Sequence, residues 1–292
     1  MGKKCFHPSY YNSFRCIADK CRHSCCVGWE ISVDDGTMEK YLALGRHDIL
    51  SHIDGGEIVL CDNGRCPFLE DSGLCRLISE FGDSHTSLIC QRHPRFYHRA
   101  GDRLECGIGL SCEEACRIVL SSDGYSEFVI SDFDGDVAEE TDFDTISHRE
   151  YLYSLLKGPL DYKSKGDAIR EKYEISDIHS SEGWGEILDS LEYLDESHRG
   201  LFRVGSNYGV NEEYLERFLA YLIFRHLTIA DSFDNLRARL GFCLLLTDIL
   251  AGYLSEGERS FDEICDYARI ISEEIEYSED NTDSLIFEFE IY

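Results

Sequence analysis

The chain has 292 residues, of which 43% are hydrophobic, and it carries 57 acidic against 28 basic side chains. This length and apolar content suit one large domain or two moderate ones with a real core, and they argue against a wholly disordered chain. Residues 121–292 hold 14 basic and 40 acidic side chains, a balance of 14 − 40 = −26. Such acidity disfavours nucleic acid as a partner and attracts basic proteins, although solubility is the simpler explanation for it.

No apolar run reaches the length of a membrane-spanning helix, because the best stretch, Leu240 to Leu254, is interrupted by Asp248. The first residues, MGKKCFHPSYYNSF, lack the apolar segment of a secretory signal. We therefore expect a cytoplasmic protein with no membrane partner. In that reducing compartment, 14 cysteines indicate metal or redox chemistry more often than structural disulfides.

In the first third, residues 5–30 form a cysteine loop without helical periodicity. Asp34 or Asp35 is a candidate N-cap for a short helix that ends near Gly45. A strand is expected at 57–61. Two further helices are expected at 74–81 and 84–90.

The next stretch mixes strand and helix signals. Residues 96–98 and 103–105 flank a turn and predict a β-hairpin. Ser111 is a candidate N-cap that places Cys112 at a helix N-terminus, where the backbone favours a thiolate. Residues 123–145 are acidic, include one possible strand at 127–130, and are expected to link two halves.

Beyond the linker, apolar residues recur at helical spacing, as in Leu215, Phe218, Leu219, Leu222 and Ile223. This predicts a helical bundle, with a possible strand where the tail alternates at 286–292. The expected fold is mainly α within an α+β class. A loop-rich, cysteine-rich half with a small hairpin (1–122) and a linker (123–145) precede the helical bundle (146–292).

Eight cysteines are the candidate metal ligands: Cys16, Cys21, Cys25, Cys26, Cys66, Cys75, Cys90 and Cys112. Thiolates favour zinc or iron–sulfur clusters over hard cations. Their wide, irregular spacing lacks the paired knuckles of most structural zinc sites. Adjacent Cys25 and Cys26 are expected to point apart and so to serve two centres. Eight thiols allow two four-cysteine sites, or one cluster with spare thiols, and spacing does not decide between them.

Other residues are weaker candidates. His93, between Arg92 and Arg95, is a candidate ligand, acid–base group or hydrogen-bond donor, or an ordinary loop histidine. The remaining thiols of the first half are Cys5, Cys61, Cys106 and Cys116. The positions of Cys243 and Cys265 on apolar helix faces predict core burial.

The order of motifs resembles the flagellin lysine N-methylase (FliB) family. The resemblance rests on FRCIADKCRHSCCVGWEI, on Thr37 and Tyr41 in a Thr-x3-Tyr helix, and then on GRCPFL, GLCRLI, CQRHPRFY and LSCEEA. The later FLAYLIFRHL and the helix after it also look like that family's helical half. The chain is similar as well to small metal-chelating domains of the CxxxCxxCC type, which share the cysteines without a common activity.

The resemblance implies a protein-lysine N-methyltransferase with an iron–sulfur cluster of the 4Fe–4S type, and the eight cysteines are the residues that match its motif. It also implies S-adenosylmethionine as methyl donor and flagellin as the protein substrate. It assigns neither a catalytic residue nor a donor site. The rival hypotheses are a metal-chelating, protein-binding module without activity, holding an iron–sulfur cluster or zinc, and a redox sensor that uses Cys25 and Cys26.

Overall fold

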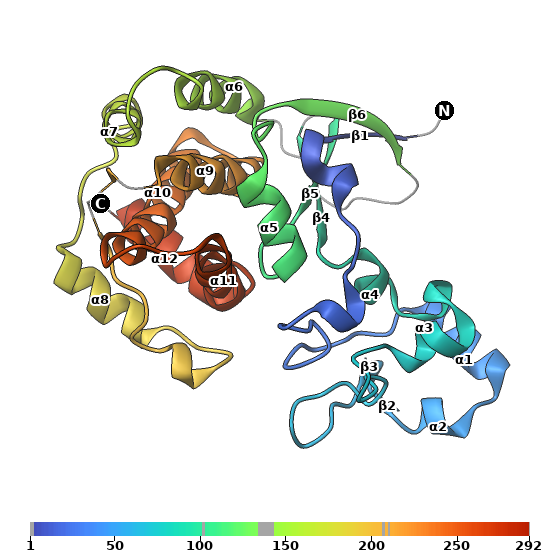
Figure 1. Cartoon of the computed structure of the whole chain (residues 1–292). Coiled ribbons are helices and arrows are strands. Elements are labelled where there is room, and N and C mark those ends of the chain that lie inside the picture. Colours follow the sequence, from blue (N-terminus) through green and yellow to red (C-terminus); the bar gives the residue numbers. More distant parts are fainter. Residues whose placement is uncertain (1–2, 101–102, 134–142, 206–207, 210, 292) are drawn as a thin grey trace. The chain divides into compact units, whose positions relative to one another are not determined.

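The computed structural model describes residues 3–100, 103–133, 143–205, 208–209 and 211–291. It is an α+β protein, as expected, with a small sheet among its N-terminal elements and helices in its C-terminal half (Figure 1). The chain forms two compact units. The cysteine unit comprises Arg15–Phe96 and Cys112–Glu114, and the helical unit comprises the rest.

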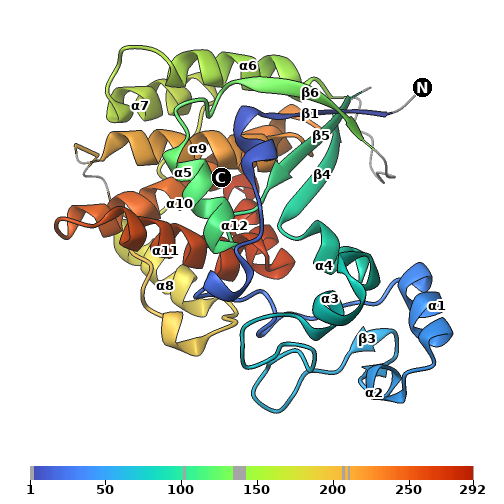
Figure 2. The same cartoon turned by 45° about the vertical axis from the view of Figure 1, so that its right-hand side comes forward.

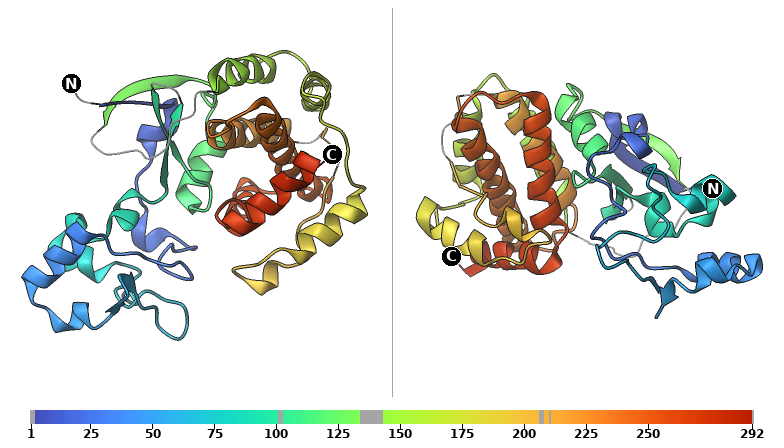
Figure 3. Two further views of the ribbon diagram at one scale, coloured as in Figure 1. Left: turned by 180° about the vertical axis from the view of Figure 1, so that it is seen from behind. Right: turned by 60° about the horizontal axis from the view of Figure 1, so that its bottom comes forward.

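The cysteine unit consists of short elements separated by long loops, which the two views of Figure 3 show. Its elements are η2 (Ala18–Lys20), α1 (Asp35–Leu44), α2 (His47–Leu50), β2 (Ile53–Asp54), β3 (Glu57–Ile58), α3 (Arg76–Phe81), η3 (Asp83–His85) and α4 (Leu88–Arg92). Its core is small, because only eight of its residues form the buried cluster. That cluster contains Ile31, Val33, Tyr41, Ile49, Ile58, Cys66, Phe68 and Leu77.

Helix α1 confirms the expected start and end. The Asp34 carboxylate accepts the backbone N–H of Thr37 at 3.0 Å, which caps the N-terminus. Gly45 ends the helix with φ of 60°, a left-handed conformation that glycine adopts without strain.

The helix expected at 84–90 is wrong in position, and the strand expected at 57–61 is shorter. Thr86 and Ser87 are extended, and the Thr86 hydroxyl donates to the carbonyl of Asp83 at 2.8 Å. This local bond closes η3, so that α4 starts only at Leu88. The strand β3 covers only Glu57–Ile58.

A four-stranded sheet belongs to the helical unit, with the order β4-β5-β1-β6 (Figure 2). Its strands are β1 (Lys3–Pro8), β4 (Arg95–Ala100), β5 (Arg103–Ile108) and β6 (Phe128–Phe133). Strand β1 pairs in parallel with β5 and antiparallel with β6, with Cys5 opposite Leu104 and Ser131. The neighbouring β4 and β5 confirm the predicted hairpin, and its turn residues 101–102 lie outside the described residues.

This pairing groups the chain differently from a sequential division at residues 122 and 145. The first strand binds β5 and β6, so residues 1–14 and 97–111 belong to the helical unit. The stretch expected as a linker contains β6 in its first part. Residues 134–142 of that stretch lie outside the described residues.

The helices of the helical unit pack around α10 (Phe233–Ser255), which contacts α9, α11 and α12 (Figure 2). The other helical elements are η1 (Ser9–Ser13), α5 (Glu113–Ser121), α6 (Thr145–Leu156), α7 (Tyr162–Lys172), α8 (Ser181–Ser190), η4 (Glu196–His198), α9 (Glu212–Leu227), α11 (Phe261–Ile271), the π-helix η5 (Ser272–Glu276) and α12 (Glu279–Ile291). By length and composition α10 would pass as a membrane span, but 83% of its apolar window is buried inside the protein. It therefore has the environment of a bundle's central helix.

The strand expected at residues 286–292 is wrong. Residues up to Ile291 belong to α12 instead, and residue 292 lies outside the described residues. Leu285, Ile286 and Phe289 are buried at helical spacing on α12. The alternation that suggested a strand covers too few residues to separate the two periodicities.

Candidate metal centre

All eight candidate cysteines lie in the cysteine unit, and none of them is in a disulfide. Electrostatic interactions among their thiols divide them into two groups of four. We call Cys26, Cys66, Cys75 and Cys90 the Cys66 set. We call Cys16, Cys21, Cys25 and Cys112 the Cys112 set.

Backbone pairing brings two loops of the Cys66 set together. The N–H of Cys66 donates to the carbonyl of Cys26 at 2.8 Å, next to an antiparallel bridge between Val27 and Arg65. A second bridge joins Leu69 to Cys75. Cys66 is buried in the small core, and both Cys26 and Cys75 pack against that core. Three of the four thiols are thus fixed by main-chain contacts.

Hydrogen-bond donors point at the sulfur atoms of the Cys66 set. The Ser87 hydroxyl donates to Cys90 Sγ at 3.2 Å. Burial raises the pKa of the Cys75 thiol, while the backbone N–H groups of Ile78 and Leu77 lower it by bonding to the sulfur. Donors that converge on sulfur are typical of thiolates that bind a metal or an iron–sulfur cluster.

Burial raises the pKa of the Cys66 thiol to about 12, against a hydrogen bond from the backbone of Phe68. Negative charge on Cys26, Cys75 and Cys90 would raise it further, so the four sulfurs influence one another. Thiolates that raise one another's pKa need compensating positive charge, which a bound metal would supply.

Tyr41 gives independent support for a group bound beside the Cys66 set. Its side chain is fully buried, and charges on Cys90, Cys75 and Cys66 act on it. Its hydroxyl has no hydrogen-bond partner among the described residues. A buried hydrogen-bond donor without an acceptor destabilises the folded state. A sulfide or thiolate of a bound cluster would accept a hydrogen bond from this hydroxyl.

The Cys112 set gathers around the segment that precedes α5. Cys112 comes directly before α5, and the next residue, Glu113, is buried. The Glu113 carboxylate accepts the backbone N–H of Arg22 at 2.8 Å and its guanidinium Nε at 2.9 Å. The same carboxylate lies 3.7 Å from Cys21 Sγ. Glu113 therefore holds the N-terminal cysteine loop beside Cys112.

The other thiols of this set lie in the same loop. The N–H of Ala18 donates to Cys16 Sγ at 3.4 Å. The thiol of Cys25 donates to the sulfur of Cys26, so the expectation that these two vicinal side chains point apart is wrong. This hydrogen bond and burial raise the pKa of Cys25, and charges on Cys112 and Cys16 raise it as well. That hydrogen bond lowers the pKa of Cys26 to about 6, with help from Ser24 and Arg65. The two vicinal thiols thus join the two sets.

The distances among possible ligand atoms bear on which metal could bind. Four thiolates on one zinc ion, each about 2.3 Å from it, lie roughly 4 Å apart. Among the described residues, the one group whose ligand atoms all lie within 4.8 Å of each other contains no cysteine. The described thiols are therefore not gathered as closely as the ligands of a single zinc ion.

The remaining cysteines have other environments. Cys5 and Cys106 form a disulfide between β1 and β5, and Cys61 is exposed. The Cys116 thiol is buried and donates to the carbonyl of Cys265 at 3.3 Å. Cys243 and Cys265 are buried among the helices, which confirms the core position expected for them.

His93 lies beside Trp29, with 6.4 Å between the ring centres. Burial lowers the pKa of His93 to about 4, so its imidazole is neutral at pH 7. Its Nε2 atom is buried and lacks a partner among the described residues. A neutral, buried ring nitrogen suits a ligand or donor role equally well.

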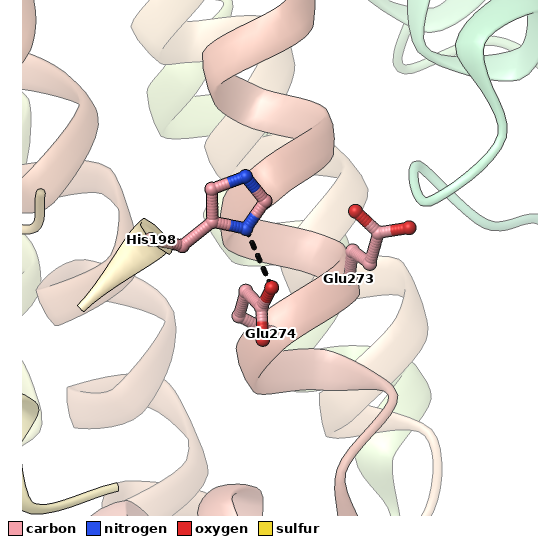
Figure 4. A group of neighbouring side chains, drawn as sticks. All are labelled: His198, Glu273 and Glu274. Carbon is pink, nitrogen blue, oxygen red and sulfur yellow. Dashed lines mark hydrogen bonds and ion pairs between the residues drawn. The ribbon is translucent and has the colours of Figure 1, made fainter. Parts of the chain in front are cut away.

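The compact group that sequence reasoning missed is His198, Glu273 and Glu274, in the helical unit (Figure 4). Its contacts explain it without an ion. Glu274 accepts the backbone N–H of Leu194 and His198 Nδ1, each at 2.6 Å, and Glu273 pairs with Arg269. These bonds fasten the loop before η4 to η5. No local motif signals them, since His198 and Glu274 are 76 positions apart.

The helical unit also contains a small cavity, lined by residues that include Arg170, Asp248 and Phe289. Its volume of about 30 Å³ leaves room for one or two water molecules. Sites for drug-sized ligands are roughly ten times larger. This cavity is therefore not a site for a methyl donor.

Part of the chain is similar to curated Salmonella proteins. Over 127 residues, 39% of this chain, it is 32% identical to proteins named lysine-N-methylase from Salmonella typhimurium (strain LT2) and Salmonella choleraesuis. Over the same length it is 28% identical to the flagellar biosynthetic protein FliU of Salmonella muenchen, of which the match covers 75%.

These matches show distant, partial homology to a lysine N-methylase. The chain spans about a third of the length of the two lysine-N-methylases, 32% in each case. No family model and no solved structure matches it. The resemblance noted in the later helices therefore stays a prediction.

Proposed function

We propose that this protein is a cytoplasmic, S-adenosylmethionine-dependent protein-lysine N-methyltransferase that acts on flagellin. The observation that carries the proposal is the 32% identity over 127 residues to proteins named lysine-N-methylase. The relative named as a flagellar biosynthetic protein supports a flagellar substrate. The cysteine motifs that carry the resemblance lie in the unit where the eight thiols gather.

The eight cysteines of the two sets would hold iron–sulfur chemistry in this enzyme. The donor set is all thiol, and hydrogen bonds reach several of its sulfur atoms. When bound, the inorganic core supplies positive charge and cross-links that the small apolar core of this unit lacks.

Methyl transfer to lysine needs the neutral amine, because the nitrogen lone pair attacks the sulfonium methyl group. A charged lysine must therefore lose a proton before transfer, which a desolvating environment favours. The balance of −26 over residues 121–292 attracts basic side chains, yet negative charge alone raises the pKa of a lysine. Docking and deprotonation accordingly need different surroundings in this enzyme.

The test is transfer of a labelled methyl group from S-adenosylmethionine to purified flagellin by the full chain, reconstituted anaerobically with iron and sulfide. Transfer to flagellin lysines, identified by mass spectrometry, supports the proposal. The variant Cys66→Ser is expected to lose at least 10-fold in rate, because it removes a buried thiol of the Cys66 set.

Cys61→Ser is the matched control, because Cys61 is exposed in the same unit and belongs to neither set. It should keep the rate of the unmodified chain. A protein that retains its full iron content and transfers no methyl group refutes the enzyme. If that protein still binds flagellin, it is instead a metal-chelating binding module.

A further inference from the structure

We propose that the cysteine unit holds two separate thiolate-ligated iron–sulfur centres, one on the Cys66 set and one on the Cys112 set. The vicinal residues Cys25 and Cys26 contribute one ligand to each. This inference rests on the iron–sulfur part of the proposed function and is independent of methyl transfer. It gives the protein a second metal centre and assigns four ligands to each.

Two distinct frameworks position the two sets. Main-chain bonds to Cys66 and Cys75, together with the small apolar core, fix the Cys66 set. The Cys112 set depends instead on the buried carboxylate of Glu113, which binds Arg22 through both backbone and side chain. These two supports share no residue, which is what two separate sites would require.

Each set has a complete complement of four thiols. Four cysteines are the usual ligand set for an iron–sulfur cluster. In the Cys66 set, Cys26 and Cys75 pack against the small core that contains Cys66, and the Ser87 hydroxyl donates to Cys90 Sγ. In the Cys112 set, the Glu113 carboxylate next to Cys112 lies 3.7 Å from Cys21 Sγ, and Cys16 and Cys25 lie in the same loop as Cys21. A hydrogen bond between the vicinal thiols of Cys25 and Cys26 joins one set to the other.

The two sets differ in accessibility. The Cys112 set has two exposed thiols, Cys16 and Cys25, and no buried one. The Cys66 set has one exposed thiol, Cys90, and one buried thiol, Cys66. We therefore expect a chelator to remove iron in two phases. The first phase empties the Cys112 set, and the slower one empties the Cys66 set.

The experiment measures iron and acid-labile sulfide per chain, with electron paramagnetic resonance of the reduced full chain, after anaerobic reconstitution. Cys25→Ser and Cys26→Ser should each retain about half of the iron and sulfide of the unmodified protein. Their spectra should differ, because each keeps a different centre. Cys61→Ser should retain the full content.

Glu113→Ala tests the second framework without removing a ligand, with Glu114→Ala as its neighbouring control. Glu113→Ala should accelerate the first phase of chelation several-fold and leave the second unchanged. Glu114→Ala should change neither phase. Far-UV circular dichroism checks that every variant retains its helices. If Cys26→Ser unfolds the cysteine unit, Cys16→Ser still decides, because it must keep a complete centre on the Cys66 set.

Three results overturn the proposal. One is an iron content in Cys16→Ser equal to that of the unmodified chain. Another is identical residual spectra in Cys25→Ser and Cys26→Ser. The third is complete loss of iron in Cys16→Ser while its helices remain. Methyl transfer is measured separately, so a protein with two centres and no transferase activity keeps this inference and refutes only the enzyme.

Discussion

Asp248 on α10 is a buried carboxylate whose charge depends on pH within the range in which proteins are handled. Its carboxylate accepts from Arg170 at 2.6 Å and from the Tyr208 hydroxyl at 2.8 Å. Burial nevertheless raises its pKa from 3.8 to about 6. The folded state therefore holds the Asp248 proton more tightly than the unfolded chain does.

This shift predicts a specific pH dependence of stability. The contribution of Asp248 is fully present below pH 3.8 and is lost as pH rises through about 6. The free energy of unfolding is expected to fall by about 3 kcal/mol over this range. Asp248→Asn should remove this dependence, which urea unfolding at intervals between pH 4 and 7 measures. Asp280→Asn removes an exposed carboxylate, and its free energy of unfolding should change with pH as that of the unmodified protein does. An equally steep pH dependence in Asp248→Asn would contradict the prediction.

The ion pair of Arg149 and Glu105 is almost completely buried, with side chains 3% and 1% exposed. The Thr228 hydroxyl also donates to Glu105 at 3.0 Å. Arg149→Leu leaves the Glu105 carboxylate buried without its cation, so we expect a loss of about 3–5 kcal/mol in the free energy of unfolding.

The exposed pair of Lys4 and Asp132 is the control for that experiment, because its side chains are 63% and 83% exposed. Lys4→Ala should cost less than about 1 kcal/mol. The double variant Glu105→Met with Arg149→Leu should recover much of the lost stability, because no lone buried charge remains. Equal effects of Arg149→Leu and Lys4→Ala would show that the buried pair has no special role.

At the scale of elements, α10 approaches another segment so closely that one of its positions admits only glycine. A Cβ at Gly252 would overlap the carbonyl oxygen of Arg203 and lie 3.1 Å from the amide nitrogen of Gly205. Both obstacles are backbone atoms. Gly252→Ala should therefore destabilise the helical unit by about 2 kcal/mol or more in thermal or urea unfolding.

Gly185 in α8 is the matched control, since a Cβ there would meet nothing within 4 Å. Gly185→Ala should stabilise the protein by roughly 0.5–1 kcal/mol, because alanine loses less backbone freedom in a helix. Stabilisation by both substitutions would mean that the contact at Gly252 is loose.

Local chemistry determined which elements the sequence could predict. The cap at Asp34 and the left-handed Gly45 are local signals, and α1 was predicted for that reason. The tail failed because seven residues alternate equally well on a strand or a short helical face. Cysteine spacing indicated soft-metal chemistry. It could not divide the eight thiols, because that division depends on Glu113, which lies 91 positions from Arg22.

On the scale of the whole molecule, the two units differ in what stabilises them. The buried cluster of the cysteine unit contains eight residues, which is a small core for a unit of this length. We therefore expect removal of bound metal to unfold this unit first. The helical unit, in which most of α10 is buried, should be little affected.

Limited proteolysis checks this expectation. Trypsin should cut the metal-free protein at Arg65 and Arg76 at least 10-fold faster than the reconstituted protein, while the region after Ala115 stays intact. Cys61→Ser should behave as the unmodified chain does in both states. Equal cleavage with and without metal would show that the apolar core alone maintains the unit.

Sequence patterns could not show which segments share a unit, because the residues of a strand do not identify the strand with which it pairs. Strand β1 stands before the cysteine loop in the chain but pairs with β5 and β6. The acidic stretch that resembled a linker supplies β6 to the same sheet. Long-range pairing of this kind depends on contacts more than 100 positions apart.

The position of β1 has a consequence for how the protein is made. As the chain leaves the ribosome, β1 emerges first and must wait for β6 until residue 133 has been synthesised. By that time residues 15–96, with seven of the eight candidate thiols, are already outside. Delivery of a cluster to those thiols during translation would thus precede completion of the sheet.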